Sequence, residues 1–492
     1  MKYKMKKSAC PVQAHHPFDD DAVHEECGVF GIYVPEGVNL SPAHEAYTAL
    51  FALQHRGQEA AGIAVNHRGV IKCHKDLGLV SQIFNQEILD SMPGEMAIGH
   101  VRYSTTGDPH RENAQPLSIT HVKGNLALAH NGNLVNASQL RREIENTGGI
   151  FRSSSDTEVL VYAIVRERLK CGSIEEAVLN TMDVVQGAYS LCIMSPRKLI
   201  AARDPRGMRP LCMGKTSEGA IIFASESCAL DALGAEFVRD IEPGEVVVIE
   251  DGEIRSLHTK NKCKTAACVF EYIYFARPDS VIDGASVELA RQEAGKYLSL
   301  EHPVGADVVI GVPDSGIPAA IGYAKCSGIP YGVGLIKNRY IARTFIQPGQ
   351  SKRERSVRLK LNALREAVSG KRVIMVDDSI VRGTTSARLV KLVRDAGAKE
   401  VHMRISAPPF RHPCFFGTDI PERTQLLAHE RTVEEMREII GVDSLGFLSI
   451  EATRRIALNC KLGFCDACFT GEYPMEVPNQ VDKNMFESEI EL

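Results

Sequence analysis

The chain has 492 residues, too many for one compact core, and its length predicts roughly two to four domains. Its 44% hydrophobic and 24% charged residues and its formal net charge of −5 are typical of a globular protein without general affinity for nucleic acid. Because no apolar run approaches the roughly 18–20 residues that span a bilayer, a membrane protein is not expected.

Residues 1–26 show no helical or strand periodicity, and we expect them to form a propeptide that is removed. The start, MKYKMKK, is basic like a secretion signal, but no apolar segment follows it, so export is not expected. The chain is therefore predicted to be cytoplasmic. There its fourteen cysteines would serve as metal ligands, nucleophiles or small core residues rather than as disulfides.

A strand is predicted to begin abruptly at Cys27, in the sequence CGVFGIY. If the chain is cut between Glu26 and Cys27, the new α-amino group, with an unperturbed pKa of about 7.7–8.0, can act as the base for the adjacent thiol. The alternative is a cysteine that merely fills space at a strand start. The sequence segments that follow favour the interpretation of Cys27 as a nucleophile.

Five segments after Cys27 carry this hypothesis: HRGQEAAGI at 55–63, GHVRYSTTG at 99–107, HNGNL at 130–134, SSDTE at 154–158 and RDPRGMRPL at 203–211. Together they resemble the N-terminal-nucleophile glutamine amidotransferases. The resemblance implies that Arg102 and Asp156 bind the α-carboxylate and α-amino group of glutamine. It also implies that Asn131 and the Gly132 amide form an oxyanion hole, whose donors can each contribute about 2.7–4 kcal/mol to transition-state stabilisation.

Each of these residues also has a structural alternative. Asn131-Gly132 is a strong hairpin-turn signal, and Arg102 after the strand 96–101 can be a plain surface charge. Ser155 is expected to cap a helix, with Glu158 as its capping-box partner. Strands at 126–130, 188–194 and 221–224, with a hairpin across 204–209, predict an antiparallel layered domain over 27–260. The resemblance specifies its fold as an α+β, four-layered αββα sandwich.

A second organisation begins near residue 261, where we expect a domain over 261–470 and a tail over 471–492. The buried strand 308–312 runs into PDSGIP at 313–318, where a glycine-containing loop meets a helix. From residue 337 to 360 a long basic connection follows, KNRYIARTFIQPGQSKRERSVRLK. This segment has two interpretations. It is either a solvated basic face, or a lid whose cations, Lys337 and Arg339 among them, neutralise phosphates.

The most informative segment is RVIMVDDSIVRGTTS at 372–386, an apolar strand that delivers two carboxylates into a loop of small residues. A helix follows and ends near Gly397, so the loop offers backbone N–H groups to a phosphate at a helix start. The string resembles the ribose-phosphate motif of the type I phosphoribosyltransferases, which have an α/β fold and use phosphoribosyl diphosphate (PRPP). The resemblance implies that Ser315, Asp377 and Asp378 surround Mg²⁺, and that PRPP is bound by Asp377, Asp378, Ser379, Arg382, Gly383, Thr384, Thr385, Lys337 and Arg339.

Both halves together resemble one family, the glutamine phosphoribosylpyrophosphate amidotransferases, over roughly 27–474. The resemblance implies that Cys27 releases ammonia from glutamine and that ammonia displaces pyrophosphate from PRPP, giving 5-phosphoribosylamine, in the first step of purine synthesis. It further implies a homo-tetramer and feedback inhibition by purine nucleotides. The rivals are amidotransferases that aminate a sugar phosphate or aspartate, and a PRPP-responsive regulator without turnover.

The C-terminal cysteines remain to be placed. Cys465 and Cys468 form a C-x₂-C pair, and Cys460 would extend it to the C-x₄-C-x₂-C spacing of plant-type ferredoxins. The contexts CVFEYIYFARPD, HPCFFG and CDACFTG instead resemble a subclass that carries a [4Fe–4S] cluster. That resemblance implies the ligands Cys268, Cys414, Cys465 and Cys468, with Cys263 and Cys460 as the remaining candidates. Six further cysteines, among them Cys326, are expected to be core residues.

Overall fold

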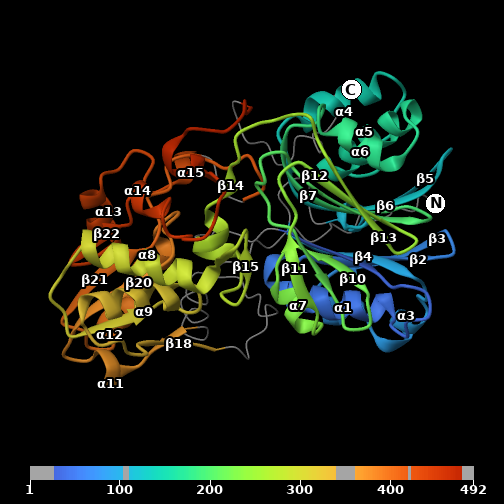
Figure 1. Ribbon diagram of the computed structural model, residues 1–492. Helices are drawn as coiled ribbons and strands as arrows, with labels where there is room; N and C mark the ends of the chain where they lie inside the picture. The colour runs from blue at the N-terminus through green and yellow to red at the C-terminus, as the bar shows by residue number, and fades with distance from the viewer. Residues whose placement is uncertain (1–26, 104–109, 339–360, 419–422, 479–492) are drawn as a thin grey trace, which may run out of the picture. The chain divides into compact units, whose positions relative to one another are not determined.

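The computed structural model describes residues 27–103, 110–338, 361–418 and 423–478 (Figure 1). These residues pack into two units. The larger unit holds the described parts of 24–294, 411–424 and 449–492, and the smaller holds those of 295–410 and 425–448. The chain therefore leaves the larger unit twice, after residues 294 and 424, and returns to it twice, at residues 411 and 449. The expected propeptide, 1–26, lies outside the described residues.

Two antiparallel sheets build the larger unit, in the strand orders β11-β9-β10-β1-β4-β2-β3 and β13-β12-β8-β7-β6-β5. The strands of the first sheet are β1 (Gly28–Tyr33), β2 (Ala60–His67), β3 (Val70–Leu77), β4 (Met96–Arg102), β9 (Cys212–Lys215), β10 (Ile221–Ala224) and β11 (Glu236–Asp240). The strands of the second are β5 (Leu117–His121), β6 (Gly124–Leu134), β7 (Gly187–Met194), β8 (Lys198–Arg203), β12 (Glu245–Glu250) and β13 (Glu253–His258).

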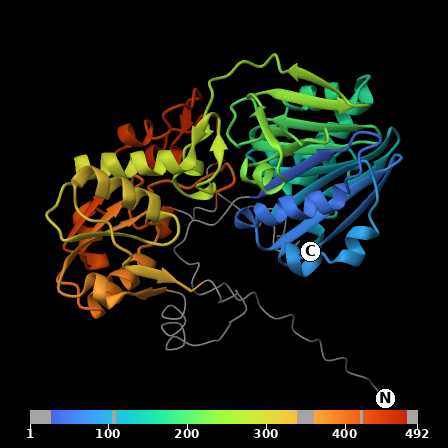
Figure 2. The ribbon, with the colours of Figure 1, turned by 60° about the horizontal axis from the view of Figure 1, so that its bottom comes forward.

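Alternation along β1 shows how the layers stack. Val29 packs between the two sheets, whereas Phe30 and Ile32 face the helices on the outer side, as the period of two in a strand requires. The outer helices of the first sheet are α1 (Pro42–Ala52), α2 (Val80–Ile83), α3 (Gln86–Asp90) and α7 (Cys228–Ala232) (Figure 2). Those of the second sheet are α4 (Ala137–Glu145), α5 (Asp156–Lys170) and α6 (Ile174–Thr181).

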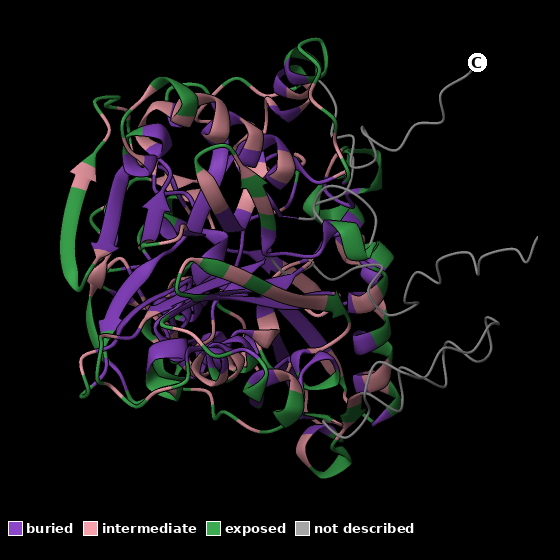
Figure 3. Cartoon of the chain, turned by 90° about the vertical axis from the view of Figure 1, so that its right-hand side faces the viewer, coloured by how far each residue is buried: buried purple, intermediate pink, exposed green. Residues whose placement is uncertain are grey.

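Because both faces of the central strands are covered, their residues are buried, whereas the edge strand β13 is largely exposed (Figure 3). The larger unit is thus the αββα sandwich that the sequence predicts. The predicted strands at 126–130, 188–194 and 221–224 lie within β6, β7 and β10.

The predicted hairpin across 204–209 is wrong. The flanking strands β8 and β9 belong to different sheets, so the segment between them crosses from one sheet to the other. Its Asp, Pro and Gly do favour a turn, but turn residues do not determine which strands pair; the long-range partners β7 and β12 hold β8, and β10 and β11 hold β9.

The smaller unit is an α/β layer around a parallel sheet in the order β17-β20-β21-β22. Its strands are β17 (Val308–Gly311), β20 (Arg372–Asp377), β21 (Glu400–Ile405) and β22 (Ser444–Phe447), and β18 (Leu335–Lys337) pairs separately with β19 (Leu361–Ala363). Its helices are the end of α8 (Val287–Glu301), α9 (Gly316–Ser327), α11 (Arg365–Val368), α12 (Thr384–Asp395) and α13 (Val433–Ile440). Parallel neighbours need crossover connections, and α9, α12 and α13 lie on three of them.

Five short elements after β13 also belong to the larger unit, two before the chain first leaves it and three after the chain's second return. They are β14 (Ala267–Cys268), the π-helix η3 (Glu271–Phe275), α14 (Ile450–Thr453), β23 (Phe464–Cys465) and α15 (Ala467–Thr470). Strand β14 pairs in parallel with β23, which places Cys268 opposite Cys465. Among the described helices, none is both long enough and apolar enough to cross a membrane.

Candidate active sites

Cys27 lies directly before the central strand β1, with 6% of its surface exposed. Its thiol donates a hydrogen bond to the carbonyl oxygen of Tyr103 at 3.4 Å. Burial raises the pKa of the Cys27 thiol to about 11, against a lowering by that hydrogen bond and by the charge of Arg102. A buried thiol of high pKa is a poor nucleophile unless a base accompanies it, which fits a cysteine that depends on its own α-amino group.

Charged groups suited to an amino acid surround this thiol. Arg102 ends β4, next to Cys27 in the antiparallel register of β1 and β4, and only 3% of it is exposed. Its guanidinium lies 3.8 Å from the carboxylate of Glu59. Asp156 opens α5, and its charge, like those of Arg102 and Glu59, acts on the pKa of Cys27. The structure therefore brings Cys27, Arg102 and Asp156 together, although 129 residues separate the first from the last.

The Asp156 carboxylate joins α5 to β6. It accepts a hydrogen bond from the Leu134 amide at 2.9 Å and lies 3.9 Å from Nδ1 of His130. Ser155 caps the helix as predicted, through a hydrogen bond from the Thr157 amide. The predicted capping-box role of Glu158 is wrong, because its carboxylate accepts from the amides of Arg152 and Ser153 instead of from that of Ser155.

Asn131 and Gly132 lie inside the long strand β6, opposite Ser190 and Tyr189 of β7, so the hairpin-turn alternative for this pair is wrong. Asn131 is completely buried, and its side-chain amide has no hydrogen-bond partner within the described part of the chain. An unpaired buried amide is costly, so its retention indicates a ligand group that it serves. At Gly132, φ is +144° and a Cβ would lie 1.9 Å from the Ala188 carbonyl oxygen, so only glycine fits.

The second site lies at the carboxyl ends of β17 and β20, where parallel sheets hold ligands. Asp377 ends β20 and Asp378 follows it; both are more than nine-tenths buried. The hydroxyl of Ser315 donates to Asp378 at 2.5 Å, as does that of Ser379. The loop that carries Ser315 can lie this close to β20 because residue 316 is glycine: a Cβ there would lie 2.5 Å from the Val376 carbonyl oxygen.

The two carboxylates oppose each other's ionisation. Burial and then the charge of Asp378 raise the pKa of Asp377 well above its usual range. A divalent cation would relieve this repulsion, and carboxylate and hydroxyl oxygens are the ligands that Mg²⁺ takes. The donor set of Ser315, Asp377 and Asp378 therefore fits the metal that the resemblance implies.

The loop after Asp378 leads into α12, which begins at Thr384 after Gly383. Thr384 and Thr385 form its first turn, where helix N–H groups favour a phosphate. The Arg382 guanidinium donates to the side chain of Gln425 at 2.7 Å. Lys337, at the end of β18, pairs with Asp314 in the loop that carries Ser315, at 3.1 Å. Arg339 and the rest of the predicted lid to residue 360 lie outside the described residues.

The four cysteines proposed as cluster ligands come together in the larger unit, from three separated segments. Burial first, and then the proximity of Cys414, Cys268 and Cys465, raises the pKa of Cys468 well above its usual range. Several half-buried thiols gathered from separate segments fit a soft metal centre.

The remaining cysteines have other surroundings. Cys263 donates to the Pro205 carbonyl oxygen at 3.2 Å, and Cys460 interacts with Tyr272. Cys326 is exposed, so the expectation that it is a core residue is wrong.

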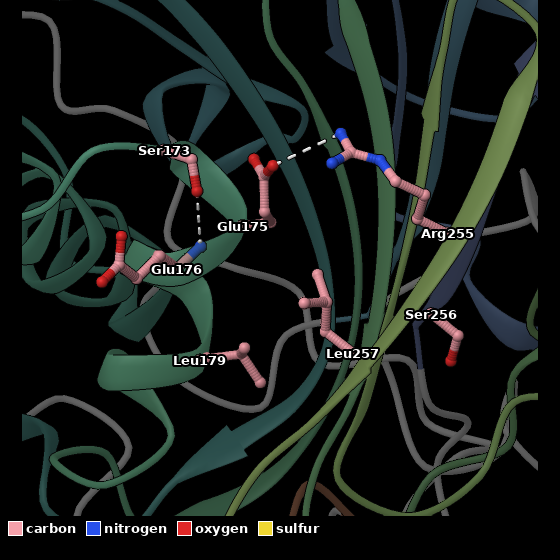
Figure 4. A pocket seen from close by; sticks show the side chains of 7 residues that line it. All are labelled: Ser173, Glu175, Glu176, Leu179, Arg255, Ser256 and Leu257. Carbon is pink, nitrogen blue, oxygen red and sulfur yellow. Dashed lines mark hydrogen bonds and ion pairs between the residues drawn. The ribbon is translucent and has the colours of Figure 1, made fainter.

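A cavity of about 610 Å³ lies apart from these residues, between α6 and β13 (Figure 4). Its polar groups already bond within the fold. Glu175 pairs with Lys198 at 2.9 Å and with Arg255 at 3.5 Å, and Ser173 caps α6. This cavity therefore does not compete with the two sites as a candidate active site.

Four further residues were not singled out from the sequence, although all fall inside motifs quoted above: the buried Arg56, Arg209 and Glu271 and the half-buried Asn133. Those motifs do not reveal that Arg56 and Arg209 both interact with Glu271, or that Asn133 bonds to Phe415. Their burial despite full charge is the structural signal that marks Arg56, Arg209 and Glu271.

Comparison with known proteins gives matches to both halves. Residues 100–232 match the glutamine amidotransferase domain family, and 288–409 match the phosphoribosyl transferase domain family. An amidophosphoribosyltransferase of Archaeoglobus fulgidus is 53% identical over 460 residues, which cover 92% of this chain and 99% of that protein. One of Bacillus subtilis is 50% identical over 462 residues, 92% and 95% of the two chains.

Solved structures agree with these sequence matches. The structure of glutamine phosphoribosylpyrophosphate amidotransferase from B. subtilis, complexed with ADP and GMP, has a TM-score of 0.86 and 48% identity. The match covers 94% of this chain and 100% of that one. A structure described as the allosteric regulatory enzyme of purine biosynthesis has a TM-score of 0.87 and the same identity.

Proposed function

The chain belongs to the amidophosphoribosyltransferase family, and we propose that its larger unit releases ammonia from glutamine at Cys27 while its smaller unit transfers that ammonia to PRPP. The thiol attacks the amide carbon of glutamine, ammonia leaves, and water hydrolyses the thioester to glutamate. Ammonia then attacks the anomeric carbon of PRPP and expels pyrophosphate, giving 5-phosphoribosylamine for purine synthesis.

The observation that carries the glutaminase assignment is the buried side-chain amide of Asn131, which has no hydrogen-bond partner among the described residues. It lies on the strand whose Leu134 amide bonds to Asp156, and the charge of Asp156 acts on the pKa of Cys27. With the Gly132 amide, the Asn131 side chain would hold the oxyanion of the tetrahedral intermediate. Arg102 would bind the α-carboxylate of glutamine and Asp156 its α-amino group. The opposite charges of these two side chains, both buried, suit the two charged groups of an amino acid.

In the second site, Ser315, Asp377 and Asp378 would hold Mg²⁺, which neutralises phosphate charge when bound. Asp377 and Asp378 would also contact the ribose hydroxyls. The loop Ser379–Gly383 with Thr384 and Thr385 would bind the 5-phosphate, and Lys337, Arg339 and Arg382 would add positive charge.

A pyrophosphate-release assay tests the division of labour. The wild type should release pyrophosphate from PRPP with either glutamine or ammonia. Cys27→Ala should lose the glutamine-dependent rate and keep the ammonia-dependent one, because the smaller unit is unchanged. Asp378→Asn should lose both. Release of no pyrophosphate by cluster-loaded, processed protein would favour the PRPP-responsive regulator instead.

We further propose that the working chain starts at Cys27 and carries a [4Fe–4S] cluster on Cys268, Cys414, Cys465 and Cys468. Intact mass of anaerobically purified protein tests both, since it should correspond to residues 27–492 plus four iron and four sulfide. Active protein that retains Met1 would contradict the terminal-amine mechanism. Cytoplasmic location, a homo-tetramer and inhibition by purine nucleotides are also proposed, the last from the ADP and GMP in the B. subtilis structure; native mass and inhibition assays would test the last two.

A further inference from the structure

The strand that carries the oxyanion donors is bonded to a loop far away in the sequence. The Asn133 side chain, two residues after Asn131, donates to the Phe415 carbonyl oxygen at 3.0 Å. Gly417 of the same loop packs against the strand, because a Cβ on it would lie 3.2 Å from the carbonyl carbon of Gly132. The segment 414–417 therefore lies directly on the part of β6 that presents Asn131 and Gly132.

A buried chain of charges joins this loop to the residue of the nucleophile. Arg209 donates through Nη2 to the Phe416 carbonyl oxygen, and its Nη1 lies 3.5 Å from the Glu271 carboxylate. Glu271 accepts two hydrogen bonds from Arg56, at 2.7 and 3.0 Å. Arg56 in turn donates through Nε to the Cys27 carbonyl oxygen at 3.0 Å.

These contacts are suited to fixing the distance between the oxyanion donors on β6 and Cys27. Arg56, Arg209 and Glu271 are each at most 2% exposed, and Glu226 supplies a second buried negative charge at 2.5 Å from Arg56. Buried ion pairs contribute little net stability, but they tolerate little displacement, since each charge depends on its partner. A mismatch of about 1 Å between reacting groups can cost roughly a hundredfold in rate.

We propose that the loop 414–417, held by Asn133 and by the Arg56–Glu271–Arg209 chain, positions the oxyanion donors Asn131 and Gly132 relative to Cys27. These residues are positioning residues: they act on glutamine hydrolysis through the donors and not by touching glutamine. The inference rests on the proposed glutaminase function and deepens it.

The test compares matched variants of the processed, cluster-loaded enzyme. Asn133→Ala removes the hydrogen bond to Phe415, and Asn125→Ala is its control, a half-buried asparagine on the same strand that bonds to Thr120 and Gly69 instead. Glu271→Gln breaks the charge chain, and Glu245→Gln is its control, a buried glutamate paired with Arg239.

We expect the glutaminase kcat to fall roughly tenfold to a hundredfold in Asn133→Ala and Glu271→Gln, with the KM for glutamine nearly unchanged. Affinity for an aldehyde analogue of glutamine, which forms a tetrahedral adduct with Cys27, should fall in parallel, while affinity for glutamate should not. The controls should keep both kcat and adduct affinity. Ammonia-dependent pyrophosphate release should be unchanged in all four.

A double-mutant cycle makes the test sharper. If Asn133 acts through the oxyanion donors, Asn133→Ala should have little further effect on kcat in an Asn131→Ala background. Full additivity would overturn the inference, as would a change confined to KM or an equal loss of the ammonia-dependent rate. A wild type without glutaminase activity would instead refute the proposed function, which keeps the two failures distinguishable.

Discussion

At the scale of single residues, the environment of Cys27 decides how its chemistry can work. Burial raises the pKa of its thiol to about 11, so the thiol is protonated at pH 7. The reactive cysteines of many enzymes are activated by nearby positive charge, but here the negative charges of Glu59 and Asp156 oppose the effect of Arg102. Activation must therefore come from a base that takes the proton during attack.

This environment predicts the pH dependence of alkylation of Cys27 in the unprocessed chain. Since the raised pKa keeps the thiol protonated, the alkylation rate should rise about tenfold per pH unit from pH 7 to pH 10. Peptide-resolved mass spectrometry after brief iodoacetamide treatment measures it, with the exposed Cys326 as the internal reference for reagent reactivity. A plateau below pH 9 would contradict the raised pKa.

The amide of Asn131, which has no partner within the described residues, predicts a loss in kcat. Asn131→Ala should lower the glutaminase kcat by roughly 10²–10³ and leave the KM for glutamine almost unchanged, because the donor acts on the developing oxyanion and not on the bound substrate. Steady-state glutamate release gives both constants. A rise in KM at constant kcat would show that Asn131 binds the substrate instead.

At the scale of secondary-structure elements, strand β6 combines two demands. It is a central strand of its sheet, between β5 and β7, and it also presents the proposed oxyanion donors. Backbone approach between β6 and β7 at Gly132 is so close that the side chain must be absent. The geometry of the site is thus part of the hydrogen-bonded ladder and not of a loop placed upon it.

Alanine substitutions at two glycines of β6 measure how much this close backbone approach at Gly132 matters for stability. Gly124→Ala should cost of order 1–3 kcal/mol of unfolding free energy through its positive φ, since a Cβ there would approach Pro196 only to 3.5 Å. Gly132→Ala suffers the same strain and also a clash with the Ala188 carbonyl oxygen, so it should be far more destabilising. Thermal unfolding of the two variants compares them, and equal melting temperatures would contradict the clash.

The sequence predicts elements better than it predicts their partners. Apolar runs located β6, β7, β10 and the βα unit around Asp377, because burial and periodicity are local signals. The prediction of a hairpin across 204–209 is wrong because the sheet to which a strand belongs depends on distant strands. The charge chain through Glu271 was missed for the same reason: 215 residues separate Glu271 from Arg56, and no spacing rule links them.

At the scale of the whole molecule, the four proposed cluster cysteines all belong to the larger unit, although three of them follow most of the smaller unit in sequence. The hydrogen bonds of Arg411 and His412 to the Cys468 carbonyl oxygen join the two returning segments. A cluster would therefore cross-link parts of the glutaminase unit, across nearly 200 residues of chain. A cross-link over so long a loop stabilises by about 5 kcal/mol in the chain-entropy view.

Removal of the cluster should thus destabilise the larger unit selectively. After anaerobic chelation of iron, hydrogen exchange should accelerate in 411–418 and 449–470, whereas β17 and β20 of the smaller unit should keep their protection. Cys326→Ser, outside the proposed ligand set, serves as a control that should exchange like the wild type. Equal acceleration in β20 would show that the cysteines stabilise the whole chain and not the larger unit alone.

The position of β1 has a consequence for the proposed mature chain. Chain ends usually fray, because a terminal residue has neighbours on one side only and gains entropy by moving. A chain that starts at Cys27 would instead begin beside an interior strand, held between β4 and β10 and tied by Arg56 at its carbonyl oxygen. Its terminal amine would then be as ordered as a core residue, so the nucleophile and its base would lose little freedom on meeting the substrate.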